Sequence, residues 1–516
     1  MNSMSPQKRD IIILLDFGAQ YSQLIARRIR AAHVYCEILP YNTPASVIAA
    51  KNPSGIIFSG GPASVLDEDS PRCDEKVLDQ DVPVLGICYG MQLITVMLGG
   101  KVVVPQQREY GKAVLSVGQG LLFENVDKQT TAWMSHTLQV EQMPPGFKTC
   151  AATAHCATAA FENTERRLFG VQFHPEVTHT PQGNKILENF LYKICGCSGD
   201  WRMSSYAQTA IEAIKQEVGD KSVLLGLSGG VDSSVVASLL HEAVGEQLTA
   251  VFVDHGLLRQ YERQEVEAVF RPRLGDNLIV VDASKRFLDK LSGISDPETK
   301  RKIIGKEFIE VFRETALSVG NLDFLAQGTI YPDVVESGSA TGMVIKSHHN
   351  VGGLPKDLPF CGVIEPLRPL FKDEVRELGE ELGLPEEMVW RPPFPGPGLA
   401  IRIIGDITEQ KLRIVRESDY ILRQEMADSG LGRSASQYFT ILTGLRSVGV
   451  MGDERSYDYT IAVRAVSTDD FMTADWLRLP FDVLDKISRR IVNEVRNVNR
   501  VVYDITSKPP ASIEWE

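Results

Sequence analysis

The chain has 516 residues and a net charge of −13 at neutral pH. This length exceeds what one hydrophobic core supports, so we expect about two to four domains. The acidic balance disfavours nucleic acid as a partner, because a phosphate backbone attracts basic surfaces. Hydrophobic residues form 43% of the sequence, as in globular proteins, and the first apolar run is too short for a signal sequence or a membrane span. Eight scattered cysteines indicate free thiols and a cytoplasmic protein.

The first segment, residues 10–198, alternates short apolar runs with amphipathic stretches. IIILLDF is followed by the helical pattern YSQLIARRIRAA, and the apolar runs GIIF and VPVLGI come further along. Strands followed by helices at this spacing predict an α/β domain with a parallel sheet. The polar residues 198–205 then form a linker.

Cys88 lies in the sequence Gly-Ile-Cys-Tyr-Gly, between an apolar run and a helical pattern. A strand, a sharp turn and a helix are the context of a nucleophile elbow, and small flanking residues allow the turn. The start of a helix also favours the reactive thiolate. Buried inert cysteines are nevertheless commoner than reactive ones, so this motif alone leaves both interpretations open.

A candidate base follows at the end of the segment, where the alternating run Val171–Phe173 leads into His174. Glu176 comes two residues later and could orient the imidazole ring. On its own this motif could be a surface loop. A cysteine elbow followed by such a histidine and glutamate argues against both the inert cysteine and the surface loop.

The second segment, residues 199–392, contains three candidate buried strands, each with ligand-binding residue types after it. The runs SVLLGL, LTAVFVD and NLIVVD predict a second parallel sheet, whose ligands bind beyond the carboxyl ends of the strands. The first run leads into SGGVDSS and a helical pattern, which suits a phosphate group. Its members, expected to bind ATP, are Ser228, Gly229, Gly230, Val231, Asp232, Ser233 and Ser234.

This loop is not a Walker motif, because no lysine occurs between Lys221 and Lys285. Asp232 at the start of the helix could carry Mg²⁺. The alternative is a glycine-rich turn without a ligand. Asp254, at the end of a later strand, is either a nucleotide contact or a capping carboxylate.

The third segment, residues 393–516, follows a break rich in proline and glycine at residues 391–399. Beyond it, YTIAVRAV alternates as a strand, and Leu484, Ile487 and Ile491 recur at helical spacing. A further alternating run, VVYDI, completes a small α+β domain. The predicted fold class is therefore two successive parallel-sheet α/β domains and a small C-terminal α+β domain.

The first segment resembles the class I, triad-type glutamine amidotransferases. The resemblance implies that Cys88 attacks the glutamine amide, that His174 passes the proton to ammonia, and that Glu176 orients His174. The sequence Ser-Gly-Gly-Pro at residues 59–62 matches the oxyanion motif of that family. The backbone N–H groups of Gly61 and Tyr89 are accordingly expected to stabilise the tetrahedral oxyanion.

The whole chain resembles the GMP synthetase family, in which such a domain is joined to a PP-loop ATP pyrophosphatase. The matching stretches are GTIYPDVVES (328–337), IKSHHNVGGLP (345–355), PFPGPGLAIR (393–402) and KPPASIEWE (508–516). The resemblance implies that xanthosine 5'-monophosphate (XMP), ATP and glutamine are the substrates, with adenylation of XMP before amination. It further implies Mg²⁺ with ATP and no other cofactor, a homodimer formed through the third domain, and no nucleic acid or membrane partner. Arg301, Lys508 and Glu514 correspond to XMP contacts, and Lys346 to a lid residue.

Two positions depart from the family pattern. Thr137 and Leu138 follow Ser135-His136 where the family has glycine and aspartate, which puts glutamine affinity or coupling in question. Pro392 stands where a polar residue is frequent, and we expect it to affect hinge geometry.

Other interpretations fit less of the chain. Asparagine synthetase uses an N-terminal cysteine and NAD synthetase a nitrilase-type glutaminase, whereas a tRNA-thiolating enzyme needs a basic surface. A zinc site at His348 and His349 lacks a carboxylate or cysteine at ligand spacing, and a solvated loop is the plainer interpretation of these residues. A non-catalytic nucleotide-binding or scaffold protein would have no need of both motifs.

Overall fold

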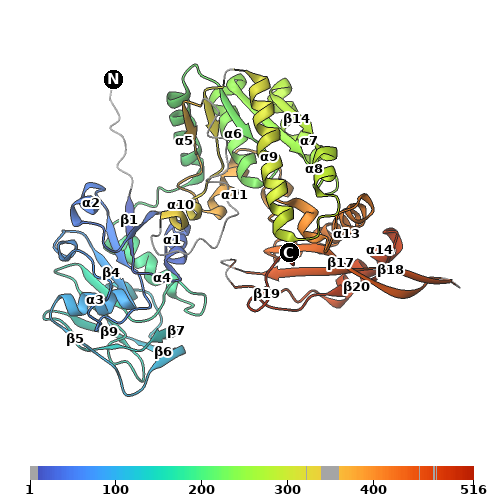
Figure 1. Cartoon of the computed structure of the whole chain (residues 1–516). Coiled ribbons are helices and arrows are strands. Elements are labelled where there is room, and N and C mark those ends of the chain that lie inside the picture. Colours follow the sequence, from blue (N-terminus) through green and yellow to red (C-terminus); the bar gives the residue numbers. More distant parts are fainter. Residues whose placement is uncertain (1–9, 321, 339–359, 452–453, 469–470, 472) are drawn as a thin grey trace. The chain divides into compact units, whose positions relative to one another are not determined.

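The structure of the chain is a computed structural model that describes residues 10–320, 322–338, 360–451, 454–468, 471 and 473–516. It divides into two compact units, residues 1–205 and residues 206–516 (Figure 1). None of the helices in these described ranges is long and apolar enough to cross a bilayer. All eight cysteines lie in the described ranges and are free thiols.

The first unit is built on a nine-stranded sheet with the order β2-β1-β3-β4-β11-β10-β9-β6-β7. Its strands are β1 (Ile11–Asp16), β2 (Tyr35–Pro40), β3 (Gly55–Phe58), β4 (Val84–Ile87), β6 (Glu109–Val117), β7 (Gln129–His136), β9 (Lys148–Ala152), β10 (Ala160–Asn163) and β11 (Leu168–Val171). The five strands from β2 to β11 pair in parallel, as predicted. The sheet then continues with antiparallel strands, which the sequence interpretation did not include.

Helices and a small second sheet complete this unit. The helices are α1 (Ser22–Ala31), α2 (Ala45–Ala50), α3 (Tyr89–Met97) and α4 (Gly183–Glu188), and β5 (Lys101–Val103) pairs with β8 (Gln139–Gln142). The buried face of α1 agrees with the predicted amphipathic helix, since Ile25, Ala26 and Ile29 are fully buried. Strands β3, β4 and β11 are buried along their whole length, as parallel strands covered on both faces should be.

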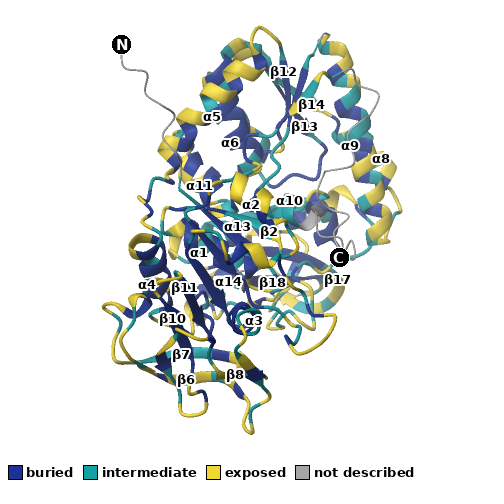
Figure 2. Ribbon diagram, turned by 90° about the vertical axis from the view of Figure 1, so that its left-hand side faces the viewer, coloured by how far each residue is buried: buried dark blue, intermediate teal, exposed yellow. Residues whose placement is uncertain are grey.

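The second unit contains a five-stranded parallel sheet with the order β14-β13-β12-β15-β16. Its strands are β12 (Val223–Gly226), β13 (Leu248–Asp254), β14 (Leu278–Asp282), β15 (Phe324–Ala326) and β16 (Gly362–Ile364). The helices of this part are α5 (Met203–Val218), α6 (Val231–Val244), α7 (Glu262–Leu274), α8 (Ser284–Leu291), α9 (Pro297–Val319), α10 (Tyr331–Gly338), α11 (Lys372–Glu381) and α12 (Glu386–Val389). Figure 2 shows the central strands buried, while the helices around them keep exposed outer faces.

The C-terminal part is the predicted α+β arrangement. The long strands β17 (Gln437–Met451) and β18 (Glu454–Ser467) pair antiparallel, and β18 also pairs with β19 (Asp475–Trp476) and β20 (Val498–Tyr503). Helices α13 (Glu409–Asp428) and α14 (Phe481–Glu494) complete it. One hydrophobic core joins it to the five-stranded sheet, because Leu224 of β12, Phe312 of α9 and Leu422 of α13 belong to the same buried cluster. The predicted fold class is confirmed.

Candidate active sites

The predicted residues of the first unit meet at one edge of its sheet. Phe58 of β3 pairs with Gly86 of β4, and Ile87 of β4 pairs with Val171 of β11. Parallel strands end at the same edge, so the segments that follow β3, β4 and β11 lie side by side. The structure thereby brings the oxyanion motif, Cys88 and His174 together from three neighbouring strands.

Cys88 has the backbone geometry of a strained turn. Its φ is 52° and its ψ is −105°, a region that non-glycine residues rarely occupy, and α3 begins at the next residue. Glycine is required on both sides. A Cβ on Gly86 would lie 2.5 Å from the Gly90 carbonyl carbon, and a Cβ on Gly90 would lie 2.5 Å from the Phe58 oxygen. This geometry agrees with the predicted elbow.

His174 is held by Glu176 in a buried pair. The imidazole Nδ1 lies 2.7 Å from Glu176 Oε1, and the glutamate side chain is fully buried. Burial alone would lower the pKa of His174, but the charge of Glu176 and a hydrogen bond with Cys88 outweigh it and raise this pKa to about 10. Because Nδ1 donates to the carboxylate, the other ring nitrogen is the one that can hold the proton given up by Cys88, and the raised pKa favours that charged pair.

The two candidate oxyanion donors lie next to this pair. Tyr89 opens α3, so its N–H belongs to the first turn, where helical amides have no partner within the helix. The neighbouring loop passes close to both side chains, since a Cβ on Gly60 would lie 3.4 Å from His174 Cε1 and 3.8 Å from Cys88 Cβ. A carbonyl oxygen placed against Gly61 and Tyr89 would therefore also be close to the sulfur.

The segment with the unusual Thr137 and Leu138 borders the same site. The Ser135 carbonyl lies 3.7 Å from Cys88 Sγ, and His136 Nδ1 donates to the Leu138 carbonyl over 2.9 Å. A carboxylate is present despite the substitution, because Glu109 of β6 lies 3.7 Å from His136 Nε2. Burial lowers the pKa of His136, against the opposing effects of the Leu138 carbonyl and of Glu109.

The PP-loop candidate follows β12. In the sheet, β13 and β15 lie on opposite sides of β12, so the strand order reverses there. Such a reversal is where open parallel sheets bind ligands. Gly229 has a φ of +78°, and the Ser228 and Ser233 hydroxyls lie 3.0 Å apart. The Gly230 N–H points to Ser228 Oγ at 3.3 Å. The loop is thus folded around its own hydroxyl groups at the start of α6.

Asp232 is engaged by a lysine that the sequence interpretation missed. The Lys372 ammonium, at the start of α11, lies 2.8 and 2.7 Å from the two carboxylate oxygens of Asp232. Gly328, the first residue of GTIYPDVVES, approaches closely enough that a Cβ on it would lie 3.2 Å from Asp232 Cβ. The carboxylate remains partly exposed, as a ligand for Mg²⁺ bound together with substrate phosphates should be.

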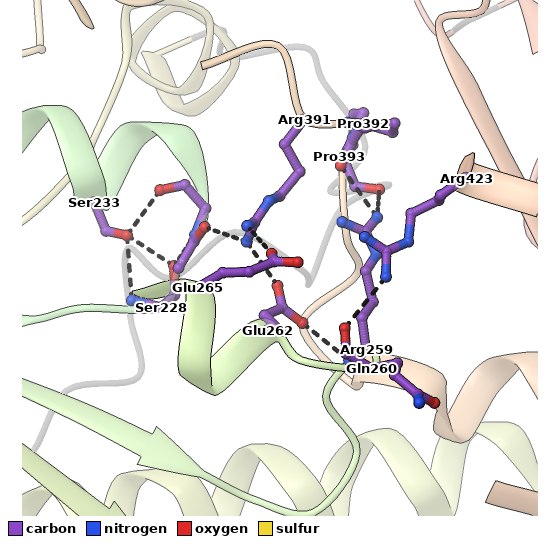
Figure 3. A network of polar contacts seen from close by, with 12 residues as sticks. Ser228, Ser233, Arg259, Gln260, Glu262, Glu265, Arg391, Pro392, Pro393 and Arg423 are labelled. Carbon is purple, nitrogen blue, oxygen red and sulfur yellow. Dashed lines mark hydrogen bonds and ion pairs between the residues drawn. The ribbon is translucent and has the colours of Figure 1, made fainter. Parts of the chain in front are cut away.

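Arg391 connects the proline-rich segment to the loop (Figure 3). Its guanidinium donates to the Gly229 carbonyl at 3.2 Å and forms ion pairs with Glu262 at 3.1 Å and Glu265 at 2.5 Å. Because the C=O and N–H of a trans peptide point in opposite directions, this contact turns the Gly230 N–H away from Arg391 and towards the loop interior. Arg391 therefore sets the orientation of a loop amide, a role that no local motif indicated.

The same segment is tied down at Pro392 and Pro393. Their carbonyls accept hydrogen bonds from the buried Arg259 side chain, at 3.2 and 3.3 Å, and Arg259 also lies over the ring of Phe394. Pro392 thus contributes its carbonyl to a fixed contact. Whether its ring alters a hinge, as expected from the sequence, stays a prediction.

The three candidate XMP residues are only partly gathered. Glu514 accepts hydrogen bonds from the fully buried Arg402 and from Gln437, and Arg301 donates to the backbone of Glu516, two residues further on. Lys508 instead donates to the Phe471 carbonyl at 2.6 Å. Lys346, the lid candidate, lies outside the described residues, as do His348 and His349.

Asp254 and Asp282 end neighbouring strands and share one arginine. Arg263 lies 3.7 Å from Asp254 and 3.6 Å from Asp282, and the Asp254 carboxylate also accepts from the Gly256 N–H. Asp254 therefore caps its strand end. A nucleotide contact of Asp254 stays a prediction.

Three family models match successive parts of the chain. Residues 13–194 match "Glutamine amidotransferase class-I", residues 204–299 match "NAD synthase", and residues 424–515 match "GMP synthase C terminal domain". The NAD synthase model covers the PP-loop, which is the element that this chain has in common with the NAD synthetases discussed above.

Curated relatives match over nearly the full length. The chain is 62% identical to "GMP synthase [glutamine-hydrolyzing]" of Acetivibrio thermocellus, over 98% of this chain and 99% of that protein. It is 61% identical to the protein of the same name from Ruminiclostridium cellulolyticum, with the same coverage. Among solved structures, a glutamine amidotransferase from Thermotoga maritima is 15% identical, covers 36% of this chain and 98% of its own, and has a TM-score of 0.31.

Proposed function

This chain belongs to the family of glutamine-hydrolysing GMP synthases and makes GMP from XMP, ATP and glutamine, and on that premise we propose which residues carry each step. The observation that carries the assignment is the presence in one chain of both centres, the strained Cys88 beside His174 and Glu176, and the PP-loop after β12. One centre releases ammonia and the other activates the acceptor. No other pairing discussed above uses both.

The first reaction begins with attack of Cys88 Sγ on the amide carbon of glutamine. The thiol proton passes to His174, and the oxyanion is held by the N–H groups of Gly61 and Tyr89. When the tetrahedral intermediate collapses, the C–N bond breaks and His174 gives its proton to the departing ammonia. Water then hydrolyses the thioester and releases glutamate.

In the second reaction the C2 oxygen of XMP attacks the α-phosphorus of ATP. Pyrophosphate leaves, and ammonia then replaces AMP at C2 to give GMP. We assign the PP-loop residues 228–234 to the pyrophosphate, with donors from backbone N–H groups and serine hydroxyls. Lys372 is close enough to exchange its contact with Asp232 for one with phosphate. Mg²⁺, when bound with ATP at Asp232, would neutralise phosphate charge.

The remaining assignments follow the domain division expected from the sequence. Residues 10–198 release ammonia, residues 199–392 activate XMP, and residues 393–516 help to bind XMP through Lys508 and Glu514, with Arg301 as a further contact. The ion pair between the buried Arg402 and Glu514 supports this, since it holds Glu514 in one position.

We also propose a homodimer in the cytoplasm. Leu445, Val448, Val450 and Tyr457 on the β17–β18 hairpin are exposed, although large apolar side chains in one element are usually covered. Sedimentation analysis should give a dimer, and Val450→Asp should shift it towards monomer. A monomeric parent protein would contradict the dimer.

The overall function is tested by incubating the purified protein with XMP, ATP, Mg²⁺ and glutamine. We expect XMP to be lost as GMP, AMP, pyrophosphate and glutamate form in equal amounts. Failure to form AMP and GMP would refute the assignment. Formation of ADP in place of AMP would refute the role of the PP-loop.

A further inference from the structure

The sulfur of Cys88 has two polar neighbours besides His174. The Ser135 carbonyl and the Gln172 side-chain nitrogen each lie 3.7 Å from Sγ. The Ser135 carbonyl can accept a hydrogen bond from the thiol, but its lone pairs repel the thiolate that forms when the thiol loses its proton. Gln172, by contrast, donates an N–H and is a favourable partner for the thiolate.

The orientation of the Gln172 amide is set by a second glutamine. Gln92 of α3 donates one N–H to Gln172 Oε1 over 3.2 Å and another to the Leu138 carbonyl over 3.0 Å. Since both hydrogens of the Gln92 amide have acceptors, the oxygen of Gln172 faces Gln92 and its nitrogen faces the sulfur. Gln172 is fully buried and Gln92 is 4% exposed, so water does not compete for these contacts.

We propose that Gln172 is a further catalytic residue of the glutaminase centre, donating an N–H to Cys88 Sγ and stabilising the thiolate, with Gln92 as its positioning residue. This rests on the proposed role of Cys88 as the nucleophile. It gives the glutamine of the Val-Gln-Phe-His-Pro-Glu stretch a task that neither His174 nor Glu176 performs. The Gln172 N–H also offsets the repulsion between the thiolate and the Ser135 carbonyl oxygen.

Other titratable groups face the site and remain when Gln172 is changed. His174 and Glu176 follow β11, whereas His136 comes from β7 and Glu109 from β6. Each of them acts on the sulfur charge through space or through His174. A change measured on substitution of Gln172 alone, with these four residues intact, therefore reports the amide donor.

The test follows alkylation of Cys88 by iodoacetamide from pH 5 to pH 10, with peptide mapping to count only this cysteine. Gln172→Met keeps the length but has no N–H, and Gln172→Glu keeps the shape but presents a carboxylate. We expect the alkylation rate at pH 7 to fall about tenfold in the first variant, and further in the second, because a hydrogen bond to a charged group is lost. The pH midpoint of alkylation should rise by about one unit in Gln172→Met.

Thr95→Val is the matched control. It removes a buried hydroxyl from the same helix, where Thr95 donates to the Met91 carbonyl, without contacting the sulfur. Its alkylation profile should equal that of the parent. Ammonium-dependent GMP synthesis should be unchanged in all three variants and identifies folded protein.

Unchanged alkylation profiles in both folded Gln172 variants would overturn the inference while leaving Cys88 as the nucleophile. If Cys88 in the parent protein is not alkylated, or its loss spares glutamine-dependent synthesis, the proposed function of Cys88 fails and the inference with it. The two failures are therefore distinguishable.

Discussion

The two chemical centres of this chain differ in how much of each is in place before substrates bind. In the glutaminase centre, Cys88, His174 and Glu176 are all buried, come from neighbouring strand ends, and already contact one another. In the synthetase centre, Asp232 and the Gly229 carbonyl are held by Lys372 and Arg391 from distant parts of the chain. Covalent catalysis needs its groups prearranged, whereas a phosphate site must exchange its contacts when a charged substrate arrives.

The first way to break this comparison is to remove Cys88, the proposed nucleophile. Cys88→Ala should lower glutamine-dependent GMP synthesis by at least about 10⁴-fold, because no other group supplies the covalent step. Synthesis from added ammonium should continue at the parental rate, measured by GMP formation. Loss of both activities in folded protein would mean that the two centres are not separate.

Substitution of Asp232 should instead affect synthesis from both nitrogen sources. Asp232→Ala removes a carboxylate from the PP-loop and leaves Lys372 without its partner, so we expect a loss of about 10³-fold with either nitrogen source. The measurement is GMP formation from glutamine and, separately, from ammonium. Normal rates in this variant would remove Asp232 from the pyrophosphate and Mg²⁺ site.

Glu176→Gln tests how far the first centre depends on its prearranged charge. It should lower glutaminase activity by about 10- to 100-fold, because the imidazole loses its orienting carboxylate. The pKa of His174 is higher in the folded protein than the unfolded value of 6.5, so its protonated form stabilises the fold. This stabilisation is fully present below pH 6.5 and is lost as the pH rises through about 10. The difference in urea midpoint between parent and variant should therefore shrink between pH 6.5 and pH 10. A constant difference over that range would contradict the charged pair.

Arg391→Gln should have the smallest effect, confined to the second centre. The Gly229–Gly230 peptide loses its anchor, so we expect pyrophosphate to inhibit ammonium-dependent synthesis about tenfold less strongly. Arg433→Gln is the matched control, because Arg433 pairs with Glu386 on the surface and its loss should change little. Equal inhibition constants for Arg391→Gln and the parent would show that the loop holds its shape without Arg391.

The site residues that the sequence predicted are those carried by short motifs. Cys88 between glycines, and His174 two residues before Glu176, combine chemistry and local geometry within a few positions. Lys372 and Arg391 could not be found this way, since 140 residues separate Lys372 from Asp232 and 162 separate Arg391 from Gly229. Their roles depend on tertiary contacts that leave no local pattern.

The fold was predictable where strands and helices alternate. The parallel strands β1, β3, β4, β12, β13 and β14 and the C-terminal α+β part follow from apolar runs and helical spacing. The antiparallel strands β6, β7, β9 and β10 were missed because no α-helices separate them and their residues do not form strong apolar runs. In β6, for example, the apolar Tyr110 and Val114 occupy exposed positions and the charged Glu109 a buried one, which obscures the alternation.

The contact between Lys372 and Asp232 has a consequence for the order of events. A free divalent ion that reaches this carboxylate competes with an ammonium group already bound to both oxygens, and it brings no new partner for the lysine. A nucleotide with its own metal would offer phosphate to the lysine, and Asp232 would then be free to hold the ion. We therefore expect the metal to enter as the nucleotide complex, with little affinity of the protein for the ion alone.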